Sequence, residues 1–175
     1  MRQIAVLLFI LIAACSETKL KGAGVVAFSK ANTGEIYFLL ADHNFPQAHR
    51  GYGAFGGGID ENETIQTAAL REFHEETQCQ FASDSLVLYK EAFYNEDRSF
   101  VSLVVSVPHR TLSPSFQPDE CQGSVYNERS DWRWVSEKDL QDYLDKPQTA
   151  PFQIWKKSAV ILQQVLDKAP WEESI

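Results

Sequence analysis

The most informative segment of the chain, Tyr52–Gln78, reads YGAFGGGIDENETIQTAALREFHEETQ. Between positions 60 and 76 it holds six carboxylates and a single arginine, Arg71. From Thr64 onward, apolar residues recur every four positions, which predicts an amphipathic helix whose apolar stripe packs on a core. Like charges at this density repel one another along a helix, so their placement indicates a role beyond contact with water.

Three glutamates of the predicted helix share one side of it. At about 100° per residue, Glu76 lies ~40° from Glu72 around the helix axis, and Glu75 lies ~60° to the other side. Hard divalent cations such as Mg²⁺ prefer several oxygen ligands, carboxylates among them. We therefore expect Glu72, Glu75 and Glu76 to bind a divalent metal ion.

Two neighbouring features support such a site. Arg71 reaches back one to two helical turns, where its guanidinium fork can hold Glu63 in a fixed geometry. The glycine run Gly56–Gly58 lets the backbone approach a ligand closely. The carbonyl of Gly57 is therefore a candidate for one further metal ligand.

The segment resembles the Nudix box, G-x5-E-x7-R-E-U-x-E-E-x-G-U, where U is aliphatic or aromatic. In this chain the box begins at Gly57, and Phe73 takes the U position. Tyr52 and Gly56 fit the aromatic and double-glycine residues that lead into the box. All of its charged positions fall in register: Glu63, Arg71, Glu72, Glu75 and Glu76.

The sequence departs from the family pattern at three positions. Gln78 stands where the box has a glycine, a residue that we expect to cap the helix in a left-handed conformation. Phe55 and Asn62 replace a common proline and glycine of the lead-in. Asn tolerates left-handed turns better than other non-glycine residues, so we expect Asn62 to be a mild change.

The resemblance implies a fold of the α/β (α+β) type, with a mixed sheet sandwiched between helices. It also implies hydrolysis of a pyrophosphate linkage in a nucleoside diphosphate derivative, with Mg²⁺ or Mn²⁺ as cofactor. The implied metal ligands are Glu72, Glu75 and Glu76 with the Gly57 carbonyl, while Glu63 and Arg71 orient them. We expect Glu76→Gln to lower kcat by orders of magnitude and to leave folding intact.

A second, weaker match lies downstream, where Glu128 precedes Trp134-Val135. It resembles the family segment in which a glutamate precedes a Trp-Val strand, and it implies that Glu128 is a further metal ligand or the general base. Asp119 and Glu120 lie on the same predicted loop and remain alternatives for the base.

Composition narrows the choice of partners. The chain of 175 residues has a net charge of −8, which argues against binding to a nucleic-acid polymer, since such binders carry basic surfaces. The alternative to an enzyme is a catalytically silent nucleotide-binding or sensor module in the cell envelope. The sequence identifies neither the nucleotide substrate nor the oligomeric state.

Outside this segment the patterning predicts one mixed α/β domain. The polar, glycine-rich stretch 43–58 is expected to lack strands, and 108–129 to be a long loop. Ser136 is placed to cap a short helix, and Pro151 to open the last one. The predicted strands are 23–28, 35–41, 85–95, 100–107 and 132–135, and the first two are expected to pair as a hairpin. The predicted helices are 64–78, 137–144 and one from 151 onward.

The first fourteen residues, Met1–Ala14, have the pattern of a secretory signal, with an apolar run too short to span a bilayer. Ile12-Ala13-Ala14-Cys15 resembles a bacterial lipobox, which implies a lipid anchor at Cys15. The expected organisation is a signal peptide (1–14), a short tether (15–21) and one hydrolase domain (22–175). We expect an outer-membrane lipoprotein facing the periplasm; a soluble secreted or periplasmic protein is the alternative, as is a cytoplasmic enzyme if the leader reflects start-site choice.

The remaining cysteines, Cys79 and Cys121, do not have the spacing of a metal motif. An oxidising envelope permits a bond between them, but we expect buried free thiols. His74 is expected to have no function. Four arginines are candidates for phosphate contacts, although ordinary surface positions are the simpler expectation: Arg50, Arg98, Arg129 and Arg133.

Overall fold

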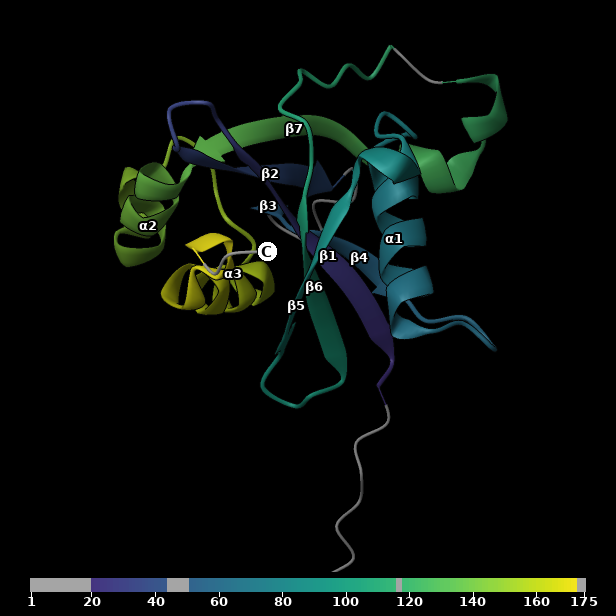
Figure 1. Ribbon diagram of the computed structural model, residues 1–175, viewed down its shortest axis with the longest axis horizontal. Helices are drawn as coiled ribbons and strands as arrows, with labels where there is room; N and C mark the ends of the chain where they lie inside the picture. The colour runs from purple at the N-terminus through teal and green to yellow at the C-terminus, as the bar shows by residue number, and fades with distance from the viewer. Residues whose placement is uncertain (1–19, 44–50, 116–117, 173–175) are drawn as a thin grey trace, which may run out of the picture.

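A seven-stranded mixed β-sheet carries helices on both of its faces in the computed structural model (Figure 1). The structure describes residues 20–43, 51–115 and 118–172. This architecture confirms the predicted sandwich of a mixed sheet between helices. The strands are β1 (Gly22–Lys30), β2 (Ile36–His43), β3 (Tyr52–Gly53), β4 (Phe55–Gly58), β5 (Val87–Tyr94), β6 (Phe100–Ser106) and β7 (Arg129–Ser136), and the helices are α1 (Ile65–Glu76), α2 (Glu137–Asp145) and α3 (Lys156–Lys168).

The central strand β1 organises the sheet. Its second half pairs antiparallel with β2, as the predicted hairpin requires, and its first half pairs antiparallel with β4. Along its other edge it pairs parallel with β6. The pairing with β4 places the glycine run beside β1, and a turn connects this strand to α1.

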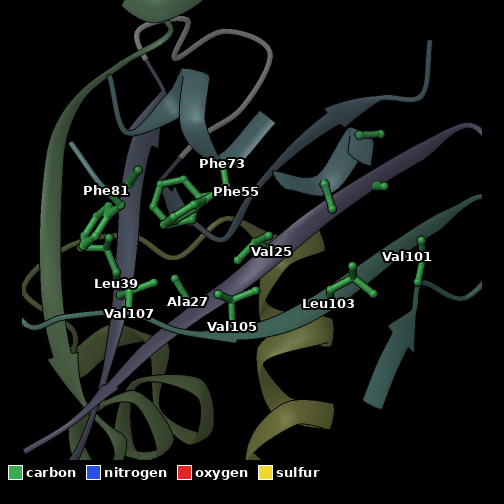
Figure 2. Packing of buried hydrophobic residues seen from close by; sticks show 14 residues of the cluster. Val25, Ala27, Leu39, Phe55, Phe73, Phe81, Val101, Leu103, Val105 and Val107 are labelled. Carbon is green, nitrogen blue, oxygen red and sulfur yellow. The ribbon is translucent and has the colours of Figure 1, made fainter. Parts of the chain in front are cut away.

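Alternate residues of β1 belong to two separate hydrophobic cores. Val25 and Ala27 point to the α1 side, where they join Phe55 and Phe73 (Figure 2). Val26 and Phe28 of the same strand point to the opposite face and pack with Leu162 and other residues of α3. This alternation is the two-residue period of a strand that is buried on both faces, and it fixes α1 firmly on one side of the sheet.

Two strands lie in the stretch that was expected to lack them. β3 and β4 have two and four residues, and the glycines of β4 contribute no side chains to a periodic pattern. Both strands are defined by backbone pairing with other strands: β3 pairs with β2, and β4 pairs with β1. Sequence periodicity therefore could not reveal them.

The last helix begins later than predicted. α3 starts at Lys156, with Trp155 as its N-cap, and Pro151 lies in a bend before it. The segment between them runs beside β3: the Tyr52 amide donates to the Gln153 carbonyl at 2.8 Å, and the Trp155 amide donates to the Tyr52 carbonyl at 2.8 Å. This pairing holds the segment extended, so the helical periodicity predicted the helix but placed its start too early.

The two downstream cysteines form a disulfide, contrary to the expectation of free thiols. Cys79 follows α1 and Cys121 ends a 3₁₀ turn, η2 (Asp119–Cys121), and their Cα atoms are 6.3 Å apart. Because they are 42 residues apart in the sequence, spacing alone could not show this proximity. The bond attaches the 108–129 segment to the end of α1.

The predicted signal peptide and Cys15 lie outside the described residues. Within the ranges that the structure describes, no helix is long and apolar enough to cross a membrane.

Candidate active site

Local interactions position α1. Asn62 adopts a left-handed conformation (φ 70°) in the turn before the helix, as expected for this substitution. The Thr64 hydroxyl accepts a hydrogen bond from the Thr67 amide at 3.1 Å and caps the N-terminus. Ala69 and Phe73 are fully buried against the sheet, so the glutamates project along the flank of an anchored helix.

Arg71 connects the predicted acidic residues. Its Nε and Nη2 donate to the two carboxylate oxygens of Glu63 at 2.9 and 3.0 Å, which is the predicted fork. Its Nη1 donates to Glu72 at 2.9 Å and to Glu75 at 3.2 Å, and Nη2 also donates to the Gly58 carbonyl at 2.9 Å. One cation therefore fixes three carboxylates relative to the glycine strand.

Glu72 lies against the backbone of Gly57. A Cβ atom at position 57 would come within 2.5 Å of the Glu72 Cδ atom, so a larger residue there would force this carboxylate to move. Burial raises the pKa of Glu72; Arg71 opposes this shift, whereas the charges of Glu75 and Glu128 add to it. A nearby cation stabilises the ionised form of a partly buried carboxylate that lies among other carboxylates.

Glu128 is therefore close enough for its charge to affect Glu72. It follows the 3₁₀ turn η3 (Ser124–Asn127) and immediately precedes β7, and η3 contacts α1. Of the alternatives, Asp119 lies in η2, and the side chain of Glu120 lies outside the described part of the chain. Glu128 thus lies between an element that contacts α1 and the start of β7, and its role stays a prediction.

Glu76 occupies a different environment from the other glutamates. Its side chain is 2% exposed, and one oxygen accepts the Gly56 amide at 2.8 Å while the other accepts Arg129 Nε at 2.8 Å. Burial raises its pKa to about 7, although Arg129 and the Gly56 amide act in the opposite direction. The ion pair of Glu76 with Arg129 thus links the end of α1 to the start of β7.

Arg129 is the main residue that sequence reasoning misplaced. It is 1% exposed, so it is neither the surface arginine nor the phosphate contact that was considered. It lies 53 residues from Glu76 in the sequence, and no local pattern indicates such a pairing. Trp132, also on β7, adds a second link by donating from its indole nitrogen to the Glu76 carbonyl at 3.0 Å.

Gln78, which stands where the Nudix box has a glycine, is accommodated by the local backbone. Gln78 adopts the left-handed conformation (φ 52°) that was expected at this position, and Cys79 does the same (φ 56°). The buried side chain of Gln78 donates from Nε2 to the Arg129 carbonyl at 3.2 Å. The substitution therefore reinforces the contact between α1 and β7 and leaves the acidic cluster in place.

The glycine strand, the anchored helix and the acidic cluster around Arg71 together define a Nudix domain. The chain belongs to this family, because the family model described as NUDIX domain matches residues 18–155.

Solved structures share the fold. A Caenorhabditis elegans Ap4A hydrolase in a binary complex is 23% identical with a TM-score of 0.54, and the match covers 85% of this chain and 98% of that one. The Nudix hydrolase RenU from Mycobacterium smegmatis is 16% identical with a TM-score of 0.55, and the match covers 86% of each chain.

Among curated proteins, the uncharacterized protein L534 of Acanthamoeba polyphaga mimivirus is 41% identical over 64 residues. The match spans 35% of this chain and only 20% of that relative. The chain thus corresponds to about a fifth of the length of this curated relative.

Proposed function

We propose that the protein is a Mg²⁺- or Mn²⁺-dependent hydrolase that cleaves a pyrophosphate linkage in a nucleoside diphosphate derivative. The observation that carries the proposal is the partly buried carboxylate cluster that Arg71 fixes against the glycine strand. Pyrophosphate is anionic, so it approaches such a cluster only if cations lie between the two. The fold relationship to an Ap4A hydrolase supports the same substrate class.

The chemistry of the donor set suits a hard divalent ion. The side chains of Glu63, Glu72 and Glu75 are 13–20% exposed, so these carboxylates are partly desolvated and still reachable from solvent. Arg71 forms ion pairs with Glu63, Glu72 and Glu75, and Arg129 forms one with Glu76. Two cations thus face four carboxylates, which leaves an excess of negative charge. Oxygen-only ligands with excess negative charge suit Mg²⁺ or Mn²⁺.

In the proposed mechanism, Glu72 and Glu75 would hold the metal with the Gly57 carbonyl. Glu76, which was also expected to bind the metal, is paired with Arg129 and would support the other two glutamates. Arg71 and Glu63 would keep these groups in place, and Glu128 would bind a further ion or serve as the general base. A bound divalent ion supplies charge neutralisation for the phosphates and lowers the pKa of that water.

The test compares two charge-neutral substitutions. Glu75→Gln removes a carboxylate that is partly exposed and held only by Arg71 among the described contacts, so we expect kcat to fall by at least a hundredfold with folding preserved. Glu61→Gln, at an exposed position in the turn before α1, is the matched control and should keep wild-type kcat. Activity is measured on a panel of nucleoside diphosphate derivatives, with and without a chelator.

The outcomes separate the enzyme from a binding module. Cleavage that survives the chelator or the Glu75→Gln substitution would contradict the proposed role of the cluster. Tight binding in calorimetry without product in the wild type would instead establish the catalytically silent nucleotide-binding module.

We also propose that Cys15 carries a lipid anchor in the bacterial cell envelope, on the strength of the lipobox resemblance. The Cys79–Cys121 disulfide is compatible with an oxidising compartment. Mass spectrometry of Cys15 in the membrane fraction tests this localisation, and an unmodified Cys15 in the soluble fraction would contradict it.

A further inference from the structure

A second group of metal-ligating side chains lies at the end of α1, outside the acidic cluster. His74, Cys79 and Cys121 each place one ligand atom so that all three atoms are within 4.8 Å of one another. His74 Nε2 is 3.9 Å from Cys121 Sγ. Since His74 is two residues from Glu72 and from Glu76, it projects about 200° around the helix from both.

We propose that these three residues form a redox-gated site for a thiophilic divalent cation, Zn²⁺, which is filled when the Cys79–Cys121 disulfide is reduced. The proposal does not depend on the hydrolase activity. Two thiolates and one imidazole are a ligand set that Zn²⁺ prefers, and a fourth position is left for water.

The geometry requires only small adjustments after reduction. In a tetrahedral zinc site the sulfur–nitrogen separation is about 3.6 Å and the sulfur–sulfur separation about 3.8 Å, given Zn–S and Zn–N bonds of about 2.3 and 2.0 Å. The 3.9 Å between His74 and Cys121 already approaches this value. The cysteines, whose Cα atoms are 6.3 Å apart, need only move their sulfur atoms apart by side-chain rotation.

The surroundings favour a cation. Cys121 is 2% exposed, whereas His74 and Cys79 are half-buried and give an ion a route from solvent. The negative charge of the neighbouring acidic cluster adds long-range attraction.

The chemistry balances in two steps. A dithiol, which becomes a disulfide, or a phosphine, which takes oxygen from water and becomes its oxide, supplies two electrons and two protons. The S–S bond breaks and two thiols form. Zn²⁺ then displaces those two protons and forms two Zn–S bonds, while neutral His74 donates its ring nitrogen. In both states the η2 segment remains tied to the end of α1, either by the disulfide or by the metal.

The experiment uses the full chain carrying Cys15→Ser, so that the third cysteine contributes no signal. The protein is reduced with a phosphine, freed of metal with a chelator and titrated with Co²⁺. We expect one equivalent of Co²⁺ to produce a thiolate-to-cobalt charge-transfer band, which Zn²⁺ then abolishes. Co²⁺ bound by carboxylates gives no such band, so the acidic cluster does not interfere.

Variants and redox state supply the controls. Cys79→Ser and Cys121→Ser should each lose the band, and His74→Ala, which keeps both cysteines, should bind Co²⁺ at least tenfold more weakly. The oxidised protein should show no band. A reduced wild-type chain without the band, a band unchanged in His74→Ala, or a disulfide that resists the phosphine in the folded protein would each overturn the proposal.

Discussion

Two adjacent glycines of β4 differ in what a side chain would meet. At Gly57 a Cβ atom would collide with the Glu72 carboxylate, whereas at Gly58 nothing lies within 4 Å. We expect Gly57→Ala to displace the Glu72 carboxylate with little loss of stability, and to lower kcat roughly tenfold or more. Gly58→Ala is the matched control and should retain activity.

The measurement for this pair is kcat as a function of Mg²⁺ concentration. Equal kinetics in the two variants would show that the contact between Gly57 and Glu72 does not position the carboxylate.

The buried pair of Glu76 and Arg129 makes a second prediction at the residue scale. Burial raises the pKa of Glu76, so the folded state favours the uncharged carboxyl. Glu76→Gln carries the same charge as that form, so we expect it to leave the free energy of unfolding near pH 7 close to the wild-type value. Urea unfolding with Glu75→Gln as control measures the effect, and a clear loss of stability in Glu76→Gln would refute the prediction.

The sequence predicted the contact of Arg71 with Glu63, which lie close together along the chain. It missed the pairing of Glu76 with Arg129, which lie far apart. The Arg71 fork onto Glu63 follows from helical spacing, and both residues lie within one box. The partner of Glu76 comes from a strand on the far side of a long loop, and its burial is a property of the assembled sheet. Arginine on a strand otherwise indicates a surface position, so the sequence held no signal for this pair.

At the scale of elements, two helix caps allow a matched comparison. Thr64 caps α1 by accepting from the Thr67 amide, and Ser136 caps α2 by accepting from the Asp139 amide, both at 3.1 Å. Replacement of either cap by Ala should lower the free energy of unfolding by about 1 kcal/mol. Because only α1 carries the acidic cluster, Thr64→Ala should also lower kcat, and Ser136→Ala should not.

Denaturant unfolding and steady-state kinetics of both variants check this prediction. An equal loss of kcat in the two variants would mean that global stability, and not the start of α1, limits activity.

The elements that were predicted correctly are those with a periodic side-chain pattern and local caps. The Ser136 cap and the β1–β2 hairpin are of this kind. The short strands β3 and β4 depend on backbone pairing with β2 and β1. The extended approach to α3 depends on backbone pairing with Tyr52. Backbone pairing leaves little trace in residue type, which is why these parts were wrong or missing in the sequence-based prediction.

At the scale of the whole molecule, two glutamates set opposite pH dependences of stability in the metal-free protein. Burial raises the pKa of Glu76 from its ordinary 4.5 to about 7, so the folded state holds a proton that the unfolded chain has released. The free energy of unfolding therefore falls as the pH rises from about 4.5 to 7. Arg71 lowers the pKa of Glu63 to about 2, so that contribution is lost as the pH falls from 4.5 towards 2.

Urea midpoints across this pH range, with a chelator present, measure both limbs. Burial also raises the pKa of Glu72, which adds to the decline above pH 4.5. Glu63→Gln should flatten only the acidic limb, and a steady rise in stability from pH 5 to 7 in the wild type would contradict the assignment for Glu76.

The strand β1 sends alternate side chains into two cores that lie on opposite faces of the sheet. Because the two faces belong to separate clusters, we expect the effects of core substitutions on them to be roughly additive in the free energy of unfolding. Stabilising substitutions on the α3 face should therefore leave the packing around Phe73, and the carboxylates of α1, in place.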